Sequence, residues 1–245
     1  MSLKKRRKIN KSKLISILFF SLLITLGTYF FLSSDFFYLK EIVINNNDKL
    51  NKEYVNKLLD VNKEKNIFLY DLKDLEEKVN SSPYIKNCNI KRKIPNKLVL
   101  EIEEKKIIGT LFNEKSYCYI DDKGNLIEKI DDVDSKSIII NVNYSINKKN
   151  INFINNDKEI LLSLISNLED NNIIKQIKSI DIRDKSEINM KCKSGLTINF
   201  NKDDNIDKTI ARLNEVLIDL QNKKQYYGNV DLTYNKYILY SPYGN

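Results

Sequence analysis

Histidine is absent from this sequence of 245 residues. Its absence excludes His-dependent catalytic triads, imidazole general bases and zinc sites with histidine ligands. Cysteine is scarce, and Cys88, Cys118 and Cys192 lie far apart without a CxxC spacing. Three scattered cysteines do not define a disulfide framework, although a single disulfide between two of them is a possible pairing. We expect Cys88 and Cys118 to be small buried side chains, because each lies in a stretch of alternating polar and apolar residues.

Other catalytic motifs are missing too. There is no Gly-rich phosphate loop, and the acids of Glu103-Glu104, Asp121-Asp122 and Asp203-Asp204 are adjacent pairs. Adjacent residues on a strand point to opposite faces, so such pairs could not flank one glycosidic bond as a wall hydrolase requires. Ser145 and Lys148 have the Ser-x-x-Lys spacing of penicillin-binding transpeptidases, but they lie in an Asn-rich predicted loop without Lys-Thr-Gly or Ser-Asp-Asn. We therefore predict no catalytic residues, no cofactor and no metal site.

Positive charge is concentrated at the start of the chain. The formal net charge is +8, and residues 1–13 hold seven cations and no acid. The remaining 34 basic side chains nearly balance the 33 acidic ones. A nucleic-acid-binding protein places its cations on the folded part of the chain. The distribution therefore argues against nucleic acid as a partner.

An uncharged apolar stretch of 19 residues, LISILFFSLLITLGTYFFL, covers residues 14–32. As a helix it would be about 28 Å long, close to the hydrocarbon thickness of a bilayer. A buried helix and a cleaved signal peptide are the alternatives. The seven preceding cations are unusual for a buried helix, and no small residues stand at a signal-peptidase spacing after the stretch. We predict an uncleaved signal anchor with the lipid bilayer as its partner.

The same cations predict the orientation. Basic residues flanking a membrane span stay in the cytoplasm. We therefore expect a single-pass type II protein of the cell membrane, with residues 1–13 as a cytoplasmic basic tail and the bulk of the chain outside.

Residues 36–105 have the pattern strand, helix, helix, strand, strand. Ile42 and Ile44 begin it, the two helices are capped by Asn51 or Asp48 and by Asp71, and the stretch CNIKRKIPNKLVLEIEEKK (88–106) predicts an antiparallel hairpin. In that hairpin the alternation groups the apolar side chains of Cys88, Ile90 and Ile94 on one strand, and those of Leu98, Leu100 and Ile102 on the other.

This order resembles a POTRA domain, and in particular the one of the division proteins FtsQ and DivIB. The family motif I-x-V-x-G-N corresponds to Ile42-Val43-Ile44-Asn45-Asn46-Asn47, where Asn46 replaces glycine as the next-best residue for a left-handed turn. P-W-V corresponds to Pro83-Tyr84-Ile85. The hairpin motif of the family corresponds to Cys88, Ile90, Arg92, Pro95, Leu98, Leu100, Ile102, Glu104 and Lys105.

The resemblance continues to the end of the chain. It includes a hairpin at 117–130, an apolar strand at 137–143, a helix around 160–168, strands at 177–182, 187–193 and 196–200, and a long helix from about Asp204. The closing YYGNVDLTYNKYILYSP is similar to the family's terminal "vDLRY" strand pair. The resemblance implies an α+β chain: a transmembrane helix at 14–32, a β-α-α-β-β POTRA module at 36–105, and a second α+β domain at 106–245 with an antiparallel sheet and a C-terminal strand pair.

In this family the terminal strands are understood to bind a small single-span partner with a coiled coil outside the membrane. The resemblance thus implies partners of the FtsB/DivIC and FtsL types. Thr233 stands where the family has arginine, which puts a salt bridge there in doubt. By position, the implied site comprises Asn229, Val230, Asp231, Leu232, Thr233, Tyr234 and Tyr240.

The implied function is that of a non-catalytic divisome scaffold at the septum, which links coiled-coil division proteins and helps control cell-wall synthesis. A different class is the alternative: a membrane-anchored extracytoplasmic sensor that binds a small molecule or wall fragment. Such a sensor needs a concave pocket with converging polar groups, which the sequence does not reveal.

Overall fold

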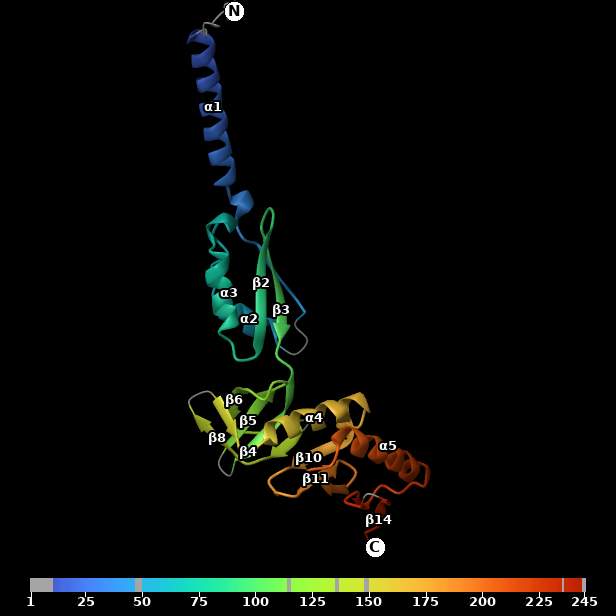
Figure 1. Cartoon of the computed structure of the whole chain (residues 1–245). Coiled ribbons are helices and arrows are strands. Elements are labelled where there is room, and N and C mark those ends of the chain that lie inside the picture. Colours follow the sequence, from blue (N-terminus) through green and yellow to red (C-terminus); the bar gives the residue numbers. More distant parts are fainter. Residues whose placement is uncertain are drawn as a thin grey trace, which may run out of the picture. The chain divides into compact units, whose positions relative to one another are not determined.

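A computed structural model of the chain (Figure 1) describes residues 11–46, 50–113, 116–134, 137–147, 150–234 and 236–243. The chain forms two compact units, Met1–Glu104 and Lys105–Asn245. Residues 1–10 of the predicted basic tail, Asn47 and Asp48 of the first turn, and Lys148 lie outside the described residues.

The first unit begins with helix α1 (Lys11–Leu32), which covers the predicted anchor. Among the described residues, α1 is the one helix long and apolar enough to cross a membrane, and none of its residues is buried. A helix that is apolar on all sides and has no buried residue fits a lipid environment. After it come η1 (Asp35–Phe37), β1 (Glu41–Asn45), α2 (Lys52–Leu59), η2 (Ile67–Leu69), α3 (Leu72–Asn80), β2 (Ile85–Lys93) and β3 (Lys97–Glu104).

The predicted helix caps of this unit are present. Asn51 accepts a hydrogen bond from the backbone N–H of Glu53, and Asp71 accepts from those of Lys73 and Asp74. These bonds satisfy amide groups that the first helical turn leaves without partners.

The sheet of the first unit has the strand order β1-β3-β2, with β1 parallel and β2 antiparallel to β3. Leu98, Leu100 and Ile102 of β3 are buried and form a core with α2 and α3. A register shift between Ile85 and Asn87 brings Ile85, Cys88 and Ile90 to the core side of β2, although their spacing is not a strict alternation. The expected strand, helix, helix, strand, strand order is therefore confirmed.

Ile94 departs from the alternation that grouped it with Cys88 and Ile90. It lies in the turn between β2 and β3, and 64% of its surface is exposed. Alternation predicts the face of a residue only while the chain remains in a strand, and β2 ends at Lys93.

The second unit is a mixed sheet covered by two long helices (Figure 1). The helices α4 and α5 contact one another and share one hydrophobic core with the sheet. In chain order the elements are β4 (Ile107–Asn113), β5 (Ser116–Asp121), β6 (Leu126–Ile130), β7 (Ile139–Asn141), β8 (Tyr144–Asn147), β9 (Asn150–Phe153), α4 (Asp157–Asp170), η3 (Ile174–Gln176), β10 (Ile177–Asp181), β11 (Glu187–Cys192), β12 (Leu196–Asn201), α5 (Ile206–Asn222), β13 (Gly228–Asp231) and β14 (Leu239–Ser241).

The α+β class of this unit is confirmed, but its sheet is not purely antiparallel as expected. Nine strands follow the order β14-β13-β12-β11-β10-β7-β4-β5-β6, and the pairs β10–β7, β12–β13 and β4–β7 are parallel. The chain passes through α4 between β7 and β10 and through α5 between β12 and β13. A crossover helix between neighbouring strands produces parallel pairing, which a hairpin cannot.

The Asn-rich stretch that was predicted to be a loop contains a β-hairpin instead. Strand β8 pairs antiparallel with β9, and Ser145 lies opposite Asn152. Tyr144, Ile146, Ile151 and Phe153 pack against the core of the unit. The alternation of these apolar side chains is a strand signal in the sequence, but the many asparagines around them led to the prediction of a loop.

All three cysteines are buried and free. Burial raises the pKa of the Cys88 thiol to about 11, with a smaller contribution from the charge of Glu76. Burial likewise raises the pKa of Cys192 to about 11. A neutral thiol in an apolar setting behaves as a small hydrophobic side chain.

A tyrosine-rich sheet edge as the candidate binding site

The predicted terminal strand pair forms one edge of the nine-stranded sheet. Strand β13 runs parallel to β12 on one side and antiparallel to β14 on the other, so β14 is the outer strand. Asn229, Val230 and Asp231 of β13 lie opposite Ser241, Tyr240 and Leu239 of β14. An outer strand has a row of backbone N–H and C=O groups without partners in the sheet, which an incoming strand can bind.

The predicted site residues divide by burial. Val230 and Leu232 are fully buried and belong to the core of the unit. Asn229, Asp231 and Thr233 are partly buried. Val230 and Leu232 can hold the strand in place, but buried side chains cannot touch a partner. The surface available for contact therefore lies on β14 and on the loop before it.

Asp231 and Thr233 form a local turn at the position of the family's arginine. The carboxylate Oδ1 of Asp231 accepts hydrogen bonds from the backbone N–H of Thr233 at 2.9 Å and from its hydroxyl at 2.6 Å. The amide of Asn201 on β12 donates to the carbonyl of Thr233 at 2.9 Å. Threonine thus closes the end of β13 by hydrogen bonds within the chain.

The loop between β13 and β14 carries a stacked pair of tyrosines. The rings of Tyr234 and Tyr237 lie 4.7 Å apart with an interplanar angle of 18°, and both side chains are exposed. The guanidinium of Arg212 on α5 donates to the carbonyl of Tyr234 at 3.0 Å, and more weakly to that of Tyr237 at 3.5 Å. Arg212 therefore connects the helix to the loop that carries the tyrosine pair.

Tyr240 is partly buried, and its hydroxyl donates to the carbonyl of Tyr227 at 2.7 Å. Gly228, the first residue of β13, has φ +140°, and a Cβ there would lie 2.6 Å from the carbonyl oxygen of Ser241 on β14. Only glycine permits this backbone conformation together with so close a strand. Beside them a surface hollow of about 680 Å³ is lined by Lys224, Gln225, Tyr226, Tyr227, Tyr240, Pro242 and Tyr243.

This edge combines a short outer strand, paired in the sheet on one side, with flat aromatic side chains, which suits the recognition of an extended peptide. In the part of the chain that the structure describes, no group of three His, Cys, Asp or Glu residues could hold a metal ion.

Sequence reasoning found the strand but missed residues that shape the edge. Leu239 and Tyr237 are exposed on or beside β14, and Arg212 comes from a helix some twenty residues earlier. The run of C-terminal tyrosines was a signal for Tyr237. No sequence signal pointed to Arg212, because its role depends on the packing of α5 beside the β13–β14 loop.

Comparison with known proteins agrees with this architecture. The profile of the POTRA domain, FtsQ-type, matches residues 37–105, and that of the cell division protein FtsQ/DivIB, C-terminal, matches residues 111–233. The cell division protein DivIB of Clostridium tetani is 27% identical over 234 residues, covering 91% of this chain and 86% of that protein. DivIB of Clostridium botulinum is 26% identical over 236 residues, covering 94% and 90%.

A solved structure was also found, the major extracytoplasmic domain of the trans isomer of DivIB from Geobacillus stearothermophilus. It matches with 8% identity, covering 49% of this chain and 97% of that chain, at a TM-score of 0.33.

An apolar N-terminal helix, a POTRA module and a C-terminal sheet with an open edge define a POTRA-containing protein of the cell division class. The chain belongs to the FtsQ/DivIB family of cell division proteins, as the resemblance of its motifs predicted.

Proposed function

We propose that this protein is a non-catalytic scaffold of the divisome. Helix α1 would anchor it as a single-pass type II protein at the division septum, with the N-terminus in the cytoplasm and both folded units outside. In terms of the chain, residues 1–13 would be the cytoplasmic tail, 14–32 the anchor, 36–105 the POTRA domain and 106–245 the binding domain. Family membership supports the role in division, and the apolar helix supports the anchor.

The partners would be single-span coiled-coil division proteins of the FtsB/DivIC and FtsL types, held at the edge formed by β13 and β14. The observation that carries this proposal is that β14 is an outer strand flanked by the exposed Tyr234–Tyr237 pair. In the proposed site, Val230 and Leu232 hold β13 in the core, whereas Asn229, Asp231, Thr233, Tyr234 and Tyr240 shape or line the surface. By organising these partners the protein would help to control septal cell-wall synthesis.

The test is co-purification of the full chain, in detergent, with the outside segments of the host's small coiled-coil division proteins. Two variants address the edge: Leu239→Lys, which places a charge on the outer strand, and Tyr234→Ala combined with Tyr237→Ala. The matched control is Tyr119→Ala on β5, which lies next to the opposite edge of the same sheet. Charge on an edge strand discourages the addition of another strand.

Loss of partner in the edge variants, with retention in the control, would support the proposal. Binding that survives in both edge variants would keep the scaffold and remove the site from this edge. A failure of the folded native chain to bind either partner would overturn the scaffold and favour the sensor that binds a small molecule or wall fragment.

A further inference from the structure

Three segments of the first unit meet at the end from which α1 leaves (Figure 1). The backbone of Leu39, just after η1, donates to the carbonyl of Lys65 at 3.1 Å, and that of Lys40 donates to Asn96 in the β2–β3 turn at 2.9 Å. The guanidinium of Arg92 at the end of β2 donates to the carbonyl of Ile67 in η2 at 2.9 Å. These bonds connect η1, η2 and the β2–β3 turn into one surface.

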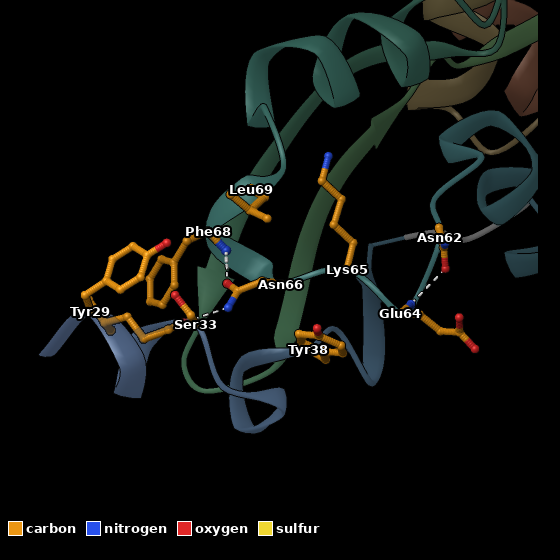
Figure 2. A pocket seen from close by; sticks show the side chains of 10 residues that line it. Tyr29, Ser33, Tyr38, Asn62, Glu64, Lys65, Asn66, Phe68 and Leu69 are labelled. Carbon is orange, nitrogen blue, oxygen red and sulfur yellow. Dashed lines mark hydrogen bonds between the residues drawn. The ribbon is translucent and has the colours of Figure 1, made fainter. Parts of the chain in front are cut away.

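The end of α1 is fixed to this surface by an asparagine. The amide nitrogen of Asn66, a buried side chain, donates to the carbonyl of Leu32 at 2.7 Å, and its oxygen accepts from the N–H of Phe68 at 3.0 Å. Figure 2 shows Asn66 between Phe68 and the end of the helix. Leu32 is the last residue of α1, so the bond satisfies a carbonyl that the helix itself leaves without a partner.

Aromatic contacts reinforce the same connection. The ring of Phe37 is buried, and its centroid lies 5.2 Å from that of Phe31 on α1, 5.1 Å from Phe36 and 5.3 Å from Phe68 on η2. A hollow of about 550 Å³ beside this cluster is lined from the helix by Tyr29 and Leu32 and from η2 by Phe68 and Leu69, among others (Figure 2). The apolar surface of the helix therefore continues onto the folded unit.

Four large apolar side chains on this surface are left exposed. Phe36 is 55% exposed, Phe68 40%, Leu69 66% and Ile94 64%. They come from all three segments, and Phe36 follows the end of α1 by only four residues. Exposed apolar side chains gathered in one place mark an interaction surface, whereas single scattered ones do not.

The residues around this surface, and its continuity with α1, indicate the kind of partner. Lys40, Lys63, Lys65 and Lys93 are exposed beside the three segments, together with the acids Asp35, Glu41, Glu64 and Asp71. Lysine stems can lie along apolar surface while their ammonium groups reach lipid phosphates, and aromatic rings favour the same interfacial layer. An apolar and aromatic surface that continues from a membrane span, with lysines at its margin, matches the interfacial layer of a bilayer.

We propose that this end of the POTRA unit rests on the membrane, with Phe36, Phe68, Leu69 and Ile94 in the interfacial layer of the lipid. The unit is then held in one orientation by the bilayer instead of moving freely beyond the anchor. This inference rests on the proposed membrane span of α1, and the experiment below separates the two.

The chain contains no tryptophan, so each introduced tryptophan is a unique fluorescent probe. The full-length variants Phe68→Trp and Ile94→Trp would be reconstituted in vesicles of phosphatidylethanolamine and phosphatidylglycerol, with nitroxide-labelled lipids as quenchers at shallow or deep positions. The control Lys86→Trp lies on β2 about 26 Å from Ile94, at roughly 3.3 Å per residue over eight residues. A second control, Leu22→Trp, reports the middle of α1.

We expect shallow nitroxides to quench Phe68→Trp and Ile94→Trp several-fold more strongly than Lys86→Trp, with blue-shifted emission for the first two. Leu22→Trp should be quenched most by the deep nitroxide. If Leu22→Trp is quenched while the other three behave alike, the membrane contact of the unit is wrong and the anchor stands. If Leu22→Trp is not quenched, the span fails and the inference with it. A blue shift at positions 68 and 94 without lipid quenching would assign the surface to a second copy of the chain and overturn the lipid contact.

Discussion

Arg212 of α5 donates a hydrogen bond to the backbone carbonyl of Tyr234 at 3.0 Å, across the loop that separates β13 from β14. The position at which the family motif has arginine holds Thr233 in this chain, and the cation that donates to the carbonyls of this loop comes from a helix. The edge strand and the helix are thus connected through one guanidinium, which makes the loop sensitive to changes on α5.

Replacing Arg212 with alanine should loosen that loop. We expect a loss of about 1 kcal/mol in unfolding free energy, because the bonds are charge-assisted but solvent-accessible. Amide exchange at residues 232–241 should rise, and partner binding should weaken if the proposed edge is the site. Lys208→Ala, one turn earlier on the exposed side of α5, is the control. Unchanged exchange in Arg212→Ala would show that the guanidinium does not hold the loop.

Gly228→Ala should separate β14 from β13. The substitution places a methyl group 2.6 Å from the carbonyl of Ser241 at φ +140°, and backbone strain of this kind costs about 1–3 kcal/mol. Circular dichroism during urea unfolding would measure the loss, and co-purification would measure binding. Gly27→Ala is the matched control, since nothing lies within 4 Å of its added carbon. Equal stability of the two variants would contradict the close approach of the strands.

The buried ion pair between Lys202 and Asp157 should be the most costly charge to disrupt in the second unit. Its atoms lie 2.7 Å apart with side chains only 9% and 4% exposed, and the ammonium also donates to the carbonyl of Ile182 at 2.8 Å. Removing Asp157 leaves the buried ammonium of Lys202 without its counter-charge. We therefore expect Asp157→Ala to lower the unfolding free energy by about 3–5 kcal/mol.

Unfolding curves of Asp157→Ala, Lys202→Met and the double variant would test this pair. The double variant should recover part of the loss, because no charge then remains unpaired. Asp219→Ala removes the exposed pair with Lys223 and should change stability by less than about 1 kcal/mol. Additive effects of the two single changes would argue against a direct interaction.

Arg92→Lys should destabilise the first unit. The guanidinium bridges the carbonyl of Ile67 at 2.9 Å and that of Tyr70 at 2.5 Å, and a lysine cannot reproduce both bonds in the same plane. We expect a cost of about 1–2 kcal/mol in unfolding free energy, measured by urea denaturation of the full chain in detergent. Lys91→Ala, which removes only the exposed pair with Glu101, should be nearly neutral.

The three thiols should react slowly in the native protein at pH 8. Cys88 and Cys192 have pKa values raised to about 11, so the reactive thiolate is scarce until the pH approaches that value, and Cys118 is also buried. A chromogenic disulfide reagent should titrate three thiols rapidly only after denaturation. Fewer than three thiols in the denatured protein would reveal a disulfide, and rapid native reaction would contradict the burial.

Local patterns predicted most of the first unit, because its contacts follow short-range periodicity. Asn46 was expected to adopt a left-handed conformation in place of the family's glycine, and its φ is 60°. Ile94 was misplaced because the alternation that governs a strand does not continue into a turn.

The second unit was predicted less fully because its arrangement depends on long-range pairing. The helices at α4 and α5 were visible as periodic apolar residues, but the parallel pairs they create require knowing which strands become neighbours. The burial of Val230 and Leu232 likewise depends on the core that the sheet shares with α4 and α5, which no local pattern shows.

The junction at Asn66 and Phe37 has a mechanical consequence. The last carbonyl of α1 and the ring of Phe31 both contact the folded unit, so a displacement of the unit is passed to the helix through these contacts. If α1 spans the membrane as proposed, a sideways force on the folded unit would act as a torque on the helix and change its tilt in the bilayer.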